Sequence, residues 1–177
     1  AKRVSLIYRL MKNFKNTYIA INFSNYFFLY FSFNILKSIF LFKIHKDIFF
    51  YYKLLYVYIF SKKAIFGNKM MNILKSSKIL VNTHIDDTEY AGNMRLFEGT
   101  GMGCLVLTDF KKDLDKIFQI KKEIEIFTSD NDLVEKCKYF LKNEKELSNI
   151  SKNGNLRTLT DHTYEQRVLL LDKFIKD

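Results

Sequence analysis

The spacing of apolar residues predicts helices in the first third of the chain. The first stretch repeats apolar side chains every three or four positions: Val4, Leu6, Ile7, Leu10, Met11 and Phe14. That period predicts an amphipathic helix, which ends by Asn16. Residues 18–21 are mainly β-branched or aromatic and predict a short strand. From residue 26 to residue 60 the apolar positions are too dense to show a period, and they predict one or two helices.

From residue 69 onward, short apolar runs alternate with helical patterns. Strands are predicted at residues 78–82, 105–107 and 124–127, and helices at 69–76, 93–101, 113–118, 129–141, 144–152 and 160–175. Gly154 is expected to close the helix that starts at residue 144. This order predicts an α/β fold, a parallel sheet with helices on both faces. Because ligands bind at the carboxyl ends of the strands in such sheets, the polar loop 82–93 is the first candidate site.

Charge divides the chain near Gly67. Residues 1–66 contain 11 Lys and Arg against one acidic residue, Asp47, whereas residues 67–177 contain 18 basic and 18 acidic residues. The first part also holds 20 of the 29 aromatic residues and none of the glycines. We therefore predict a basic, aromatic-rich helical segment at 1–66, followed by a separate domain at 67–177.

The basic segment suits a membrane surface better than a nucleic acid. It has no RNP-type motif and no helix-turn-helix spacing, so no nucleic-acid partner is predicted. Lysines interleaved with Phe and Tyr in residues 26–63 favour peripheral contact with an anionic bilayer. The alternative interpretation is that this segment is an ordinary element of the core and that its lysines only reflect a lysine-rich sequence.

An uncharged run at residues 16–36 is long enough to span a bilayer. Five Asn and Ser side chains interrupt it, and lipid would leave them without partners, which argues against a spanning helix. The chain shows no signal-peptide pattern. We therefore expect a cytoplasmic location, with any membrane contact at the inner face of the cell membrane.

The segment from Asn93 to Thr108 has the residue types that bind a nucleotide. Asn93 is a good N-cap, and the helix that it starts can hold a phosphate at its positive end. Arg95, in the first turn, could add a bidentate phosphate contact. Glu98 lies one turn later, where a carboxylate can accept hydrogen bonds from a ribose diol. The glycines that follow fit neither the dinucleotide fingerprint nor a P-loop.

An ordered set of motifs resembles a known family. The set comprises Ser77–Lys78–Ile79, Asn82–Thr83–His84, Asn93–x–Arg95–Leu96–Phe97–Glu98, Gly103, Thr108, Asp161–His162–Thr163–Tyr164 and Arg167. It resembles the donor-binding domain of GT-B glycosyltransferases, and within the broad family-1 type it is most similar to the CgeB-like group. The resemblance covers residues 62–177 well and residues 1–25 loosely. It implies a Rossmann-like fold, the C-terminal half of a GT-B enzyme.

The resemblance implies a glycosyltransferase of the hexosyltransferase type, acting in glycan biosynthesis. Such an enzyme moves a sugar from a nucleotide-diphosphate sugar to a saccharide, lipid-linked or protein acceptor, and needs neither a metal nor another cofactor. The donor-binding residues that the resemblance implies are His84, Asn93, Arg95, Leu96 and Glu98. Glu98 would contact the ribose, and the start of the helix would lie near the diphosphate or the sugar. No catalytic residue is implied.

Two departures from the family limit this interpretation. Many relatives have two glutamates separated by seven residues, whereas eight residues separate Glu89 from Glu98, so the role of the first glutamate is not carried over to Glu89. GT-B enzymes also have an N-terminal acceptor domain, which is absent from this sequence, so we expect the chain to be inactive alone. The alternative is a non-catalytic nucleotide-binding or membrane-docking domain that retains the fold.

Structural roles compete with the functional ones. His84 is equally explained as a structural histidine, Arg95 as an ion-pair residue and Glu98 as a helix-surface carboxylate. His162 is expected to pack or cap a helix, and the two cysteines are expected to be small buried apolar residues. Three acidic residues share one loop, Asp86, Asp87 and Glu89, but we expect them to be solvated and predict no metal site.

Overall fold

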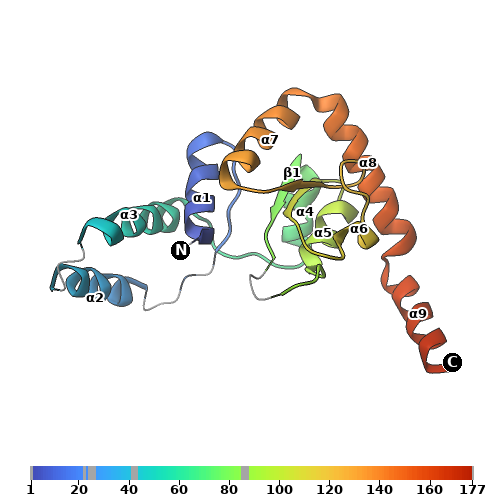
Figure 1. The fold of residues 1–177 in the computed structure, drawn as a ribbon, viewed down its shortest axis with the longest axis horizontal. Helices are drawn as coiled ribbons and strands as arrows, with labels where there is room; N and C mark the ends of the chain where they lie inside the picture. The colour runs from blue at the N-terminus through green and yellow to red at the C-terminus, as the bar shows by residue number, and fades with distance from the viewer. Residues whose placement is uncertain (1, 22, 24–26, 41–43, 85–87, 177) are drawn as a thin grey trace. The chain divides into compact units, whose positions relative to one another are not determined.

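The structure, a computed structural model, describes residues 2–21, 23, 27–40, 44–84 and 88–176. The chain forms two compact units, unit 1 at Ala1–Ile65 and unit 2 at Phe66–Asp177 (Figure 1). The described residues of unit 1 form three helices, α1 (Lys2–Asn13), α2 (Phe27–Phe40) and α3 (Ile44–Phe60). The dense apolar run between residues 26 and 60 therefore forms two helices in its described part, as the sequence allowed.

Aromatic rings hold the helices of unit 1 together. Tyr8 of α1 meets Tyr56 of α3 edge to face, with 5.1 Å between ring centroids. Phe27 of α2 stacks on Tyr58 of α3 at 4.4 Å. Val57 of α3, only 1% exposed, lies at the centre of the packing. Edge-to-face and offset ring pairs of this kind add to the stabilisation that comes from buried apolar area.

The predicted strand at residues 18–21 is wrong. Only an isolated bridge between Ala20 and Lys62 forms there, with hydrogen bonds from Ile21 N to Lys62 O and from Lys62 N to Ile19 O. A strand needs a partner of similar length, and residues 62–65 supply a single paired position.

Among the described residues, no helix has both the length and the apolar character required to cross a bilayer.

Unit 2 is built on a parallel sheet. Its elements are α4 (Asn68–Ser76), β1 (Ile79–Asn82), α5 (Met94–Gly101), β2 (Leu105–Asp109), α6 (Leu114–Ile117), β3 (Glu125–Phe127), α7 (Asp130–Lys142), α8 (Glu144–Asp161) and α9 (Tyr164–Lys176). The strands lie in the order β1-β2-β3, and Ile79 pairs with Leu105 while Leu107 pairs with Glu125. This is the Rossmann-like α/β fold that the sequence predicted, with β1 beside α4 and α5 and with α8 running on towards α9 (Figure 1).

The central strand is covered on both faces. Residues 105–108 of β2 are 0% exposed, and consecutive side chains of a strand point to opposite faces. Gly99 lets α5 approach one of these faces, because a Cβ at this position would lie 2.3 Å from Leu80 Cδ2 and 2.9 Å from Val106 Cγ2. The absence of a side chain therefore sets the distance between α5 and the sheet.

Two predicted helix boundaries near the C-terminus are wrong. Helix α8 passes through Gly154 and ends at Asp161, and the last helix begins at Tyr164 rather than near residue 160. Gly154 is a contact residue and not a helix end, since a Cβ there would lie 2.3 Å from the backbone oxygen of Glu123. Tertiary packing outweighs the helix-ending tendency of glycine at this position.

Candidate functional site

Polar side chains meet where the first two strands of the sheet end. Asn82, the last residue of β1, donates from Nδ2 to Thr108 Oγ1 of β2 at 3.1 Å. Asn93 donates in turn to Asn82 Oδ1 at 2.9 Å. Asn82 and Thr108 are buried, at 4% and 0% exposure. Because β1 and β2 are parallel, their carboxyl ends and the start of α5 form one edge, which these bonds hold rigid.

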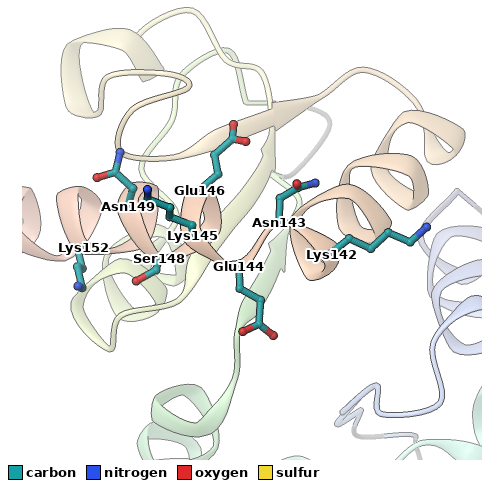
Figure 2. Close-up of a pocket in the computed structure, with 8 residues that line it drawn as sticks. All are labelled: Lys142, Asn143, Glu144, Lys145, Glu146, Ser148, Asn149 and Lys152. Carbon is teal, nitrogen blue, oxygen red and sulfur yellow. The ribbon is translucent and has the colours of Figure 1, made fainter.

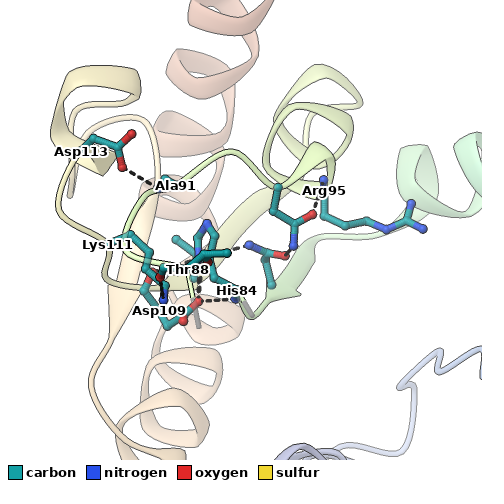
Figure 3. A network of polar contacts seen from close by, with 10 residues as sticks. His84, Thr88, Ala91, Arg95, Asp109, Lys111 and Asp113 are labelled. Carbon is teal, nitrogen blue, oxygen red and sulfur yellow. Dashed lines mark hydrogen bonds and ion pairs between the residues drawn. The ribbon is translucent and has the colours of Figure 1, made fainter. Parts of the chain in front are cut away.

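His84 and Asp109 extend this network. The backbone N and the ring Nδ1 of His84 both lie 2.8 Å from Asp109 Oδ1 (Figure 3). Burial alone raises the pKa of Asp109, but the hydrogen bonds from the backbone and ring of His84 outweigh it and leave that pKa below its ordinary value. The His84 side chain is 2% exposed, so it is a buried member of the network.

Asp109 was missed in the sequence analysis. It ends β2, and a carboxylate directly after a buried apolar strand is a usable signal for a residue at the ligand-binding edge of a sheet. The partner of Asp109 lies 25 positions earlier in the chain, and the pairing register together with the path of the chain after β1 brings the two together.

Asn93 begins α5, as predicted. Its Oδ1 accepts a hydrogen bond from Arg95 N at 3.0 Å, the usual bond of an N-cap. Leu96 follows in the first turn and is 0% exposed, packed in a core cluster that includes Val106 and Phe118. Leu96 therefore supports the position of the helix, and its side chain does not reach the surface.

Arg95 and Glu98 form an ion pair of their own. Arg95 Nη1 contacts Glu98 Oε2, and it also lies 2.7 Å from Met70 Sδ of α4. The side chains are 44% and 16% exposed respectively. In Figure 3 the Arg95 side chain extends away from His84 and Asp109. The five candidate residues thus divide between the buried network at the strand ends, the core, and this pair on another side of α5.

The described part of the loop before α5 is fastened to the segment after β2. Glu89 pairs with Lys112, with 3.1 Å between Oε1 and Nζ, and both side chains are largely exposed. Ala91 N donates to a carboxylate oxygen of Asp113 (Figure 3). These contacts hold residues 89–91 beside the polar network. The carboxylate of Glu89 is engaged in its ion pair with Lys112.

Metal ligands do not gather in the described part of the chain. Asp86 and Asp87, two of the three acidic residues in the loop, lie outside the described residues. Across residues 2–21, 23, 27–40, 44–84 and 88–176, no group of three His, Cys, Asp or Glu side chains could hold a metal ion.

The remaining singled-out residues pack as expected. The ring of His162 meets Phe97 and Phe118 edge to face, with centroids 5.1 and 5.2 Å apart, and its Nε2 lies 3.0 Å from Ile117 O. Cys104 and Cys137 are buried, and burial raises their thiol pKa values to about 11 and about 12. Both thiols therefore stay protonated at neutral pH and are poor nucleophiles.

An open depression lies at the opposite edge of the sheet. Its lining runs from Lys142 through Asn149 to Lys152, on the end of α7 and the start of α8 (Figure 2). Glu144 in this lining bonds to Lys78, which directly precedes β1, at 2.6 Å. The depression therefore lies at the amino end of the strand, away from the polar network, and its lining is charged helix surface.

The sequence matches one family model. The match is to a family described as glycosyl transferase-like and covers residues 42–172. The matched range takes in α3 of unit 1 and, in unit 2, the whole sheet, the polar network, α5 and α8. No curated protein matches the chain.

Proposed function

The chain belongs to the glycosyl transferase-like family, and from this premise we propose that unit 2 is the donor-binding half of a glycosyltransferase of the hexosyltransferase type. The proposed donor is a nucleotide-diphosphate sugar, and the proposed acceptor is a saccharide, a lipid-linked sugar or a protein. The reaction breaks the bond between the anomeric carbon and the diphosphate oxygen and forms a bond from that carbon to an acceptor oxygen, which loses its proton.

The single observation that carries the proposal is the rigid polar edge formed by β1, β2 and α5. Asn82, Asn93 and Thr108 are linked by hydrogen bonds of 2.9 and 3.1 Å, so the start of α5 is fixed against the strand ends. A helix N-terminus at such an edge carries partial positive charge and favours phosphate. Fixed dipoles stabilise charge without reorganising during the reaction, which is what a departing nucleoside diphosphate requires.

The donor-binding roles follow from this placement. Glu98, partly exposed beside Arg95, is proposed to accept hydrogen bonds from the ribose. Arg95 holds that carboxylate and adds a positive charge in the first turn of α5. His84 and Asn93 are proposed to act from the buried network at the diphosphate or sugar, and Leu96 by supporting α5 from the core. The proposed chemistry uses helix and side-chain charge in place of a metal.

No residue of the chain is proposed as the base that takes the acceptor proton. We also propose that the isolated chain binds the donor and does not transfer its sugar. The proposed partners are the nucleotide-sugar donor, a glycan or lipid-linked acceptor and, through residues 26–63, the surface of a membrane. The proposed location is the cytoplasm, at the inner face of the cell membrane. The proposed process is glycan biosynthesis.

The test is saturation-transfer NMR of the purified chain with UDP, GDP, ADP, CMP and dTDP. We expect one nucleotide to bind and Glu98→Ala to weaken it by about 1–3 kcal/mol, because a hydrogen bond to a charged group is lost. Glu144→Ala is the matched control, since Glu144 also pairs with a cation but lies at the other end of β1. Equal affinity in the parent and Glu98→Ala would remove Glu98 from the site.

A second measurement separates the enzyme from a non-catalytic nucleotide-binding domain. The nucleotide that binds identifies the donor to use, and release of free nucleotide from that sugar donor is followed with and without an added acceptor. Turnover by the chain would contradict its proposed inactivity in isolation. Failure of all five nucleotides to bind would contradict the donor site itself.

A further inference from the structure

Large apolar side chains are exposed along one side of α3, and we call them the α3 stripe. Ile48, Phe49, Tyr52, Ile59 and Phe60 are 55%, 71%, 54%, 60% and 59% exposed. With 3.6 residues per turn, these five positions fall within about 120° of the helix circumference. Val57, which packs inside unit 1, lies at about 180° from Ile48 on the same scale. Val57 is therefore on the opposite side of α3, but the α3 stripe borders the contact with α1, since Tyr52 and Tyr56 meet the ring of Tyr8 at 5.9 and 5.1 Å between centroids.

Helix α2 adds to the exposed apolar surface of the same unit. Phe33 and Leu36 are 66% and 65% exposed. They lie on the side of α2 away from Phe27 and Phe31, whose rings contact Tyr58 and Tyr51 of α3. Helix α2 thus packs through one face and presents large apolar groups on another.

Unit 1 also carries an excess of positive charge. Unit 1 contains eleven Lys and Arg against Asp47, whereas residues 67–177 contain equal numbers of basic and acidic residues. Lys37 of α2 is exposed, as are Lys62 and Lys63, which follow α3 almost at once. Lys12 lies 4.9 Å from the ring centroid of Tyr56, so an aromatic side chain and a cation share the surface there as well.

The partner that covers such a surface must be both apolar and negatively charged. A nucleic acid offers phosphates but no apolar layer for Ile48 or Phe49, and an apolar groove of a protein does not account for ten excess positive charges. A bilayer with anionic headgroups supplies both, since amphipathic helices bury aliphatic and aromatic groups at the boundary of headgroups and acyl chains while lysines stay with the phosphates.

We propose that unit 1 docks on an anionic membrane surface through the α3 stripe, with Phe33, Leu36 and the neighbouring lysines beside it. Helix α3 lies along the surface and does not cross it, in line with its length and composition. This docking does not depend on the proposed donor site in unit 2, and it would hold a glycosyltransferase where lipid-linked acceptors occur.

The test is co-sedimentation of the full chain with two kinds of vesicle. One is phosphatidylcholine alone, and the other contains about one-third phosphatidylglycerol, which provides the anionic charge. We expect the chain to sediment with the anionic vesicles, to stay in solution with the neutral ones, and to be released by high salt.

Two variants probe the two parts of the surface. Ile48→Ser/Phe49→Ser/Phe60→Ser removes apolar groups, and we expect at least ten-fold weaker vesicle binding. Lys37→Gln/Lys63→Gln removes two cations, and we expect about a five-fold loss for each. All these side chains are exposed, so circular dichroism and melting temperature should stay as in the parent.

Matched controls lie in unit 2. Leu156→Ser/Leu159→Ser removes apolar groups of similar exposure, 67% and 58%, and Lys116→Gln/Lys138→Gln removes two exposed cations. Neither control should change vesicle binding. Unchanged binding in the α3 triple variant, or equal loss in its control, overturns the proposal.

Two other results also overturn it. Absence of binding to anionic vesicles together with binding to single-stranded RNA would assign the surface to nucleic acid. A dimer in light scattering that the α3 triple variant dissociates, without vesicle binding, would assign the stripe to a second copy of the chain. Nucleotide binding by unit 2 is measured separately, so the two proposals fail independently.

Discussion

The two units of this chain use their apolar residues in opposite ways. In unit 2 the central strand β2 has four consecutive residues at 0% exposure, and Gly99 and Gly154 bring helices to within contact of backbone and core. In unit 1 five large apolar side chains of one helix face outward, and ring contacts do most of the packing. Unit 2, which contains glycines and balanced charge, packs into a rigid scaffold. Unit 1, which has no glycine and an excess of basic residues, exposes large apolar side chains.

This comparison bears on how the proposed function is divided. The polar edge of unit 2 is held by hydrogen bonds between buried side chains, which suits a site that must keep fixed dipoles in place. The proposed docking of the α3 stripe needs no fixed geometry, because a fluid lipid surface adapts to the shape of the side chains that contact it. Each unit can therefore be tested by changing the feature on which it depends.

The largest effect is expected at Gly154 in unit 2. Gly154→Ala places a Cβ 2.3 Å from the backbone oxygen of Glu123. A backbone atom cannot move aside as the end of a flexible side chain can. We expect a loss of about 3 kcal/mol in the free energy of unfolding, measured by urea denaturation. Gly101→Ala is the control, because its Cβ would meet only Thr158 Cγ2 at 3.5 Å, and the better helix propensity of alanine should keep it neutral or stabilising. Equal behaviour of the two variants would contradict the close packing of α8 on unit 2.

A smaller effect is expected in the packed face of unit 1. Val57→Ala removes two methyl groups from a side chain that is 1% exposed, and we expect a loss of about 2 kcal/mol. Phe49→Ala, on the α3 stripe, should change stability by less than about 0.5 kcal/mol although it removes a larger group. Denaturation of both variants measures the difference. A greater loss in Phe49→Ala would show that the stripe belongs to the folded core.

The smallest effect is expected from the pH dependence that Asp109 contributes. Its folded pKa is below the ordinary value, so its contribution to stability is present in full above the unfolded pKa of about 4 and is lost as pH falls through the lower folded value. Asp109→Asn keeps an oxygen for His84 but removes this titration. We expect the stability curves of parent and variant to differ most above pH 4 and to converge in acid. Parallel curves throughout would show that Asp109 is not held by His84.

Most elements of unit 2 were predictable because their signals are local. Ser129 and Asn93 cap helices where their residue types indicated, since each side chain bonds to an N–H two or three residues ahead. The three strands were recognised from short apolar runs. Alternation of these strands with helices then led to the parallel sheet, since a parallel pair requires a crossover of about a dozen residues or more.

The site was predictable only in part. The sequence indicated the loop and the helix start at Asn93, but it did not indicate that Arg95 pairs with Glu98 and extends away from His84 (Figure 3). It also did not indicate Asp109. Whether two side chains 25 positions apart meet depends on strand register and on the path of the loop between them, and neither is written in a local pattern.

The sequence by itself determined the charge division at the end of unit 1, the strand and helix order of unit 2, and the capped start of α5, because each depends on residues close together in the chain. The tertiary structure alone decided that α8 continues through Gly154, that residues 18–21 make a bridge and no strand, and that Asp109 holds His84. In each of these cases the deciding atoms belong to a segment distant in sequence. Packing and hydrogen bonding with that segment then outweigh the local preference of the residues involved.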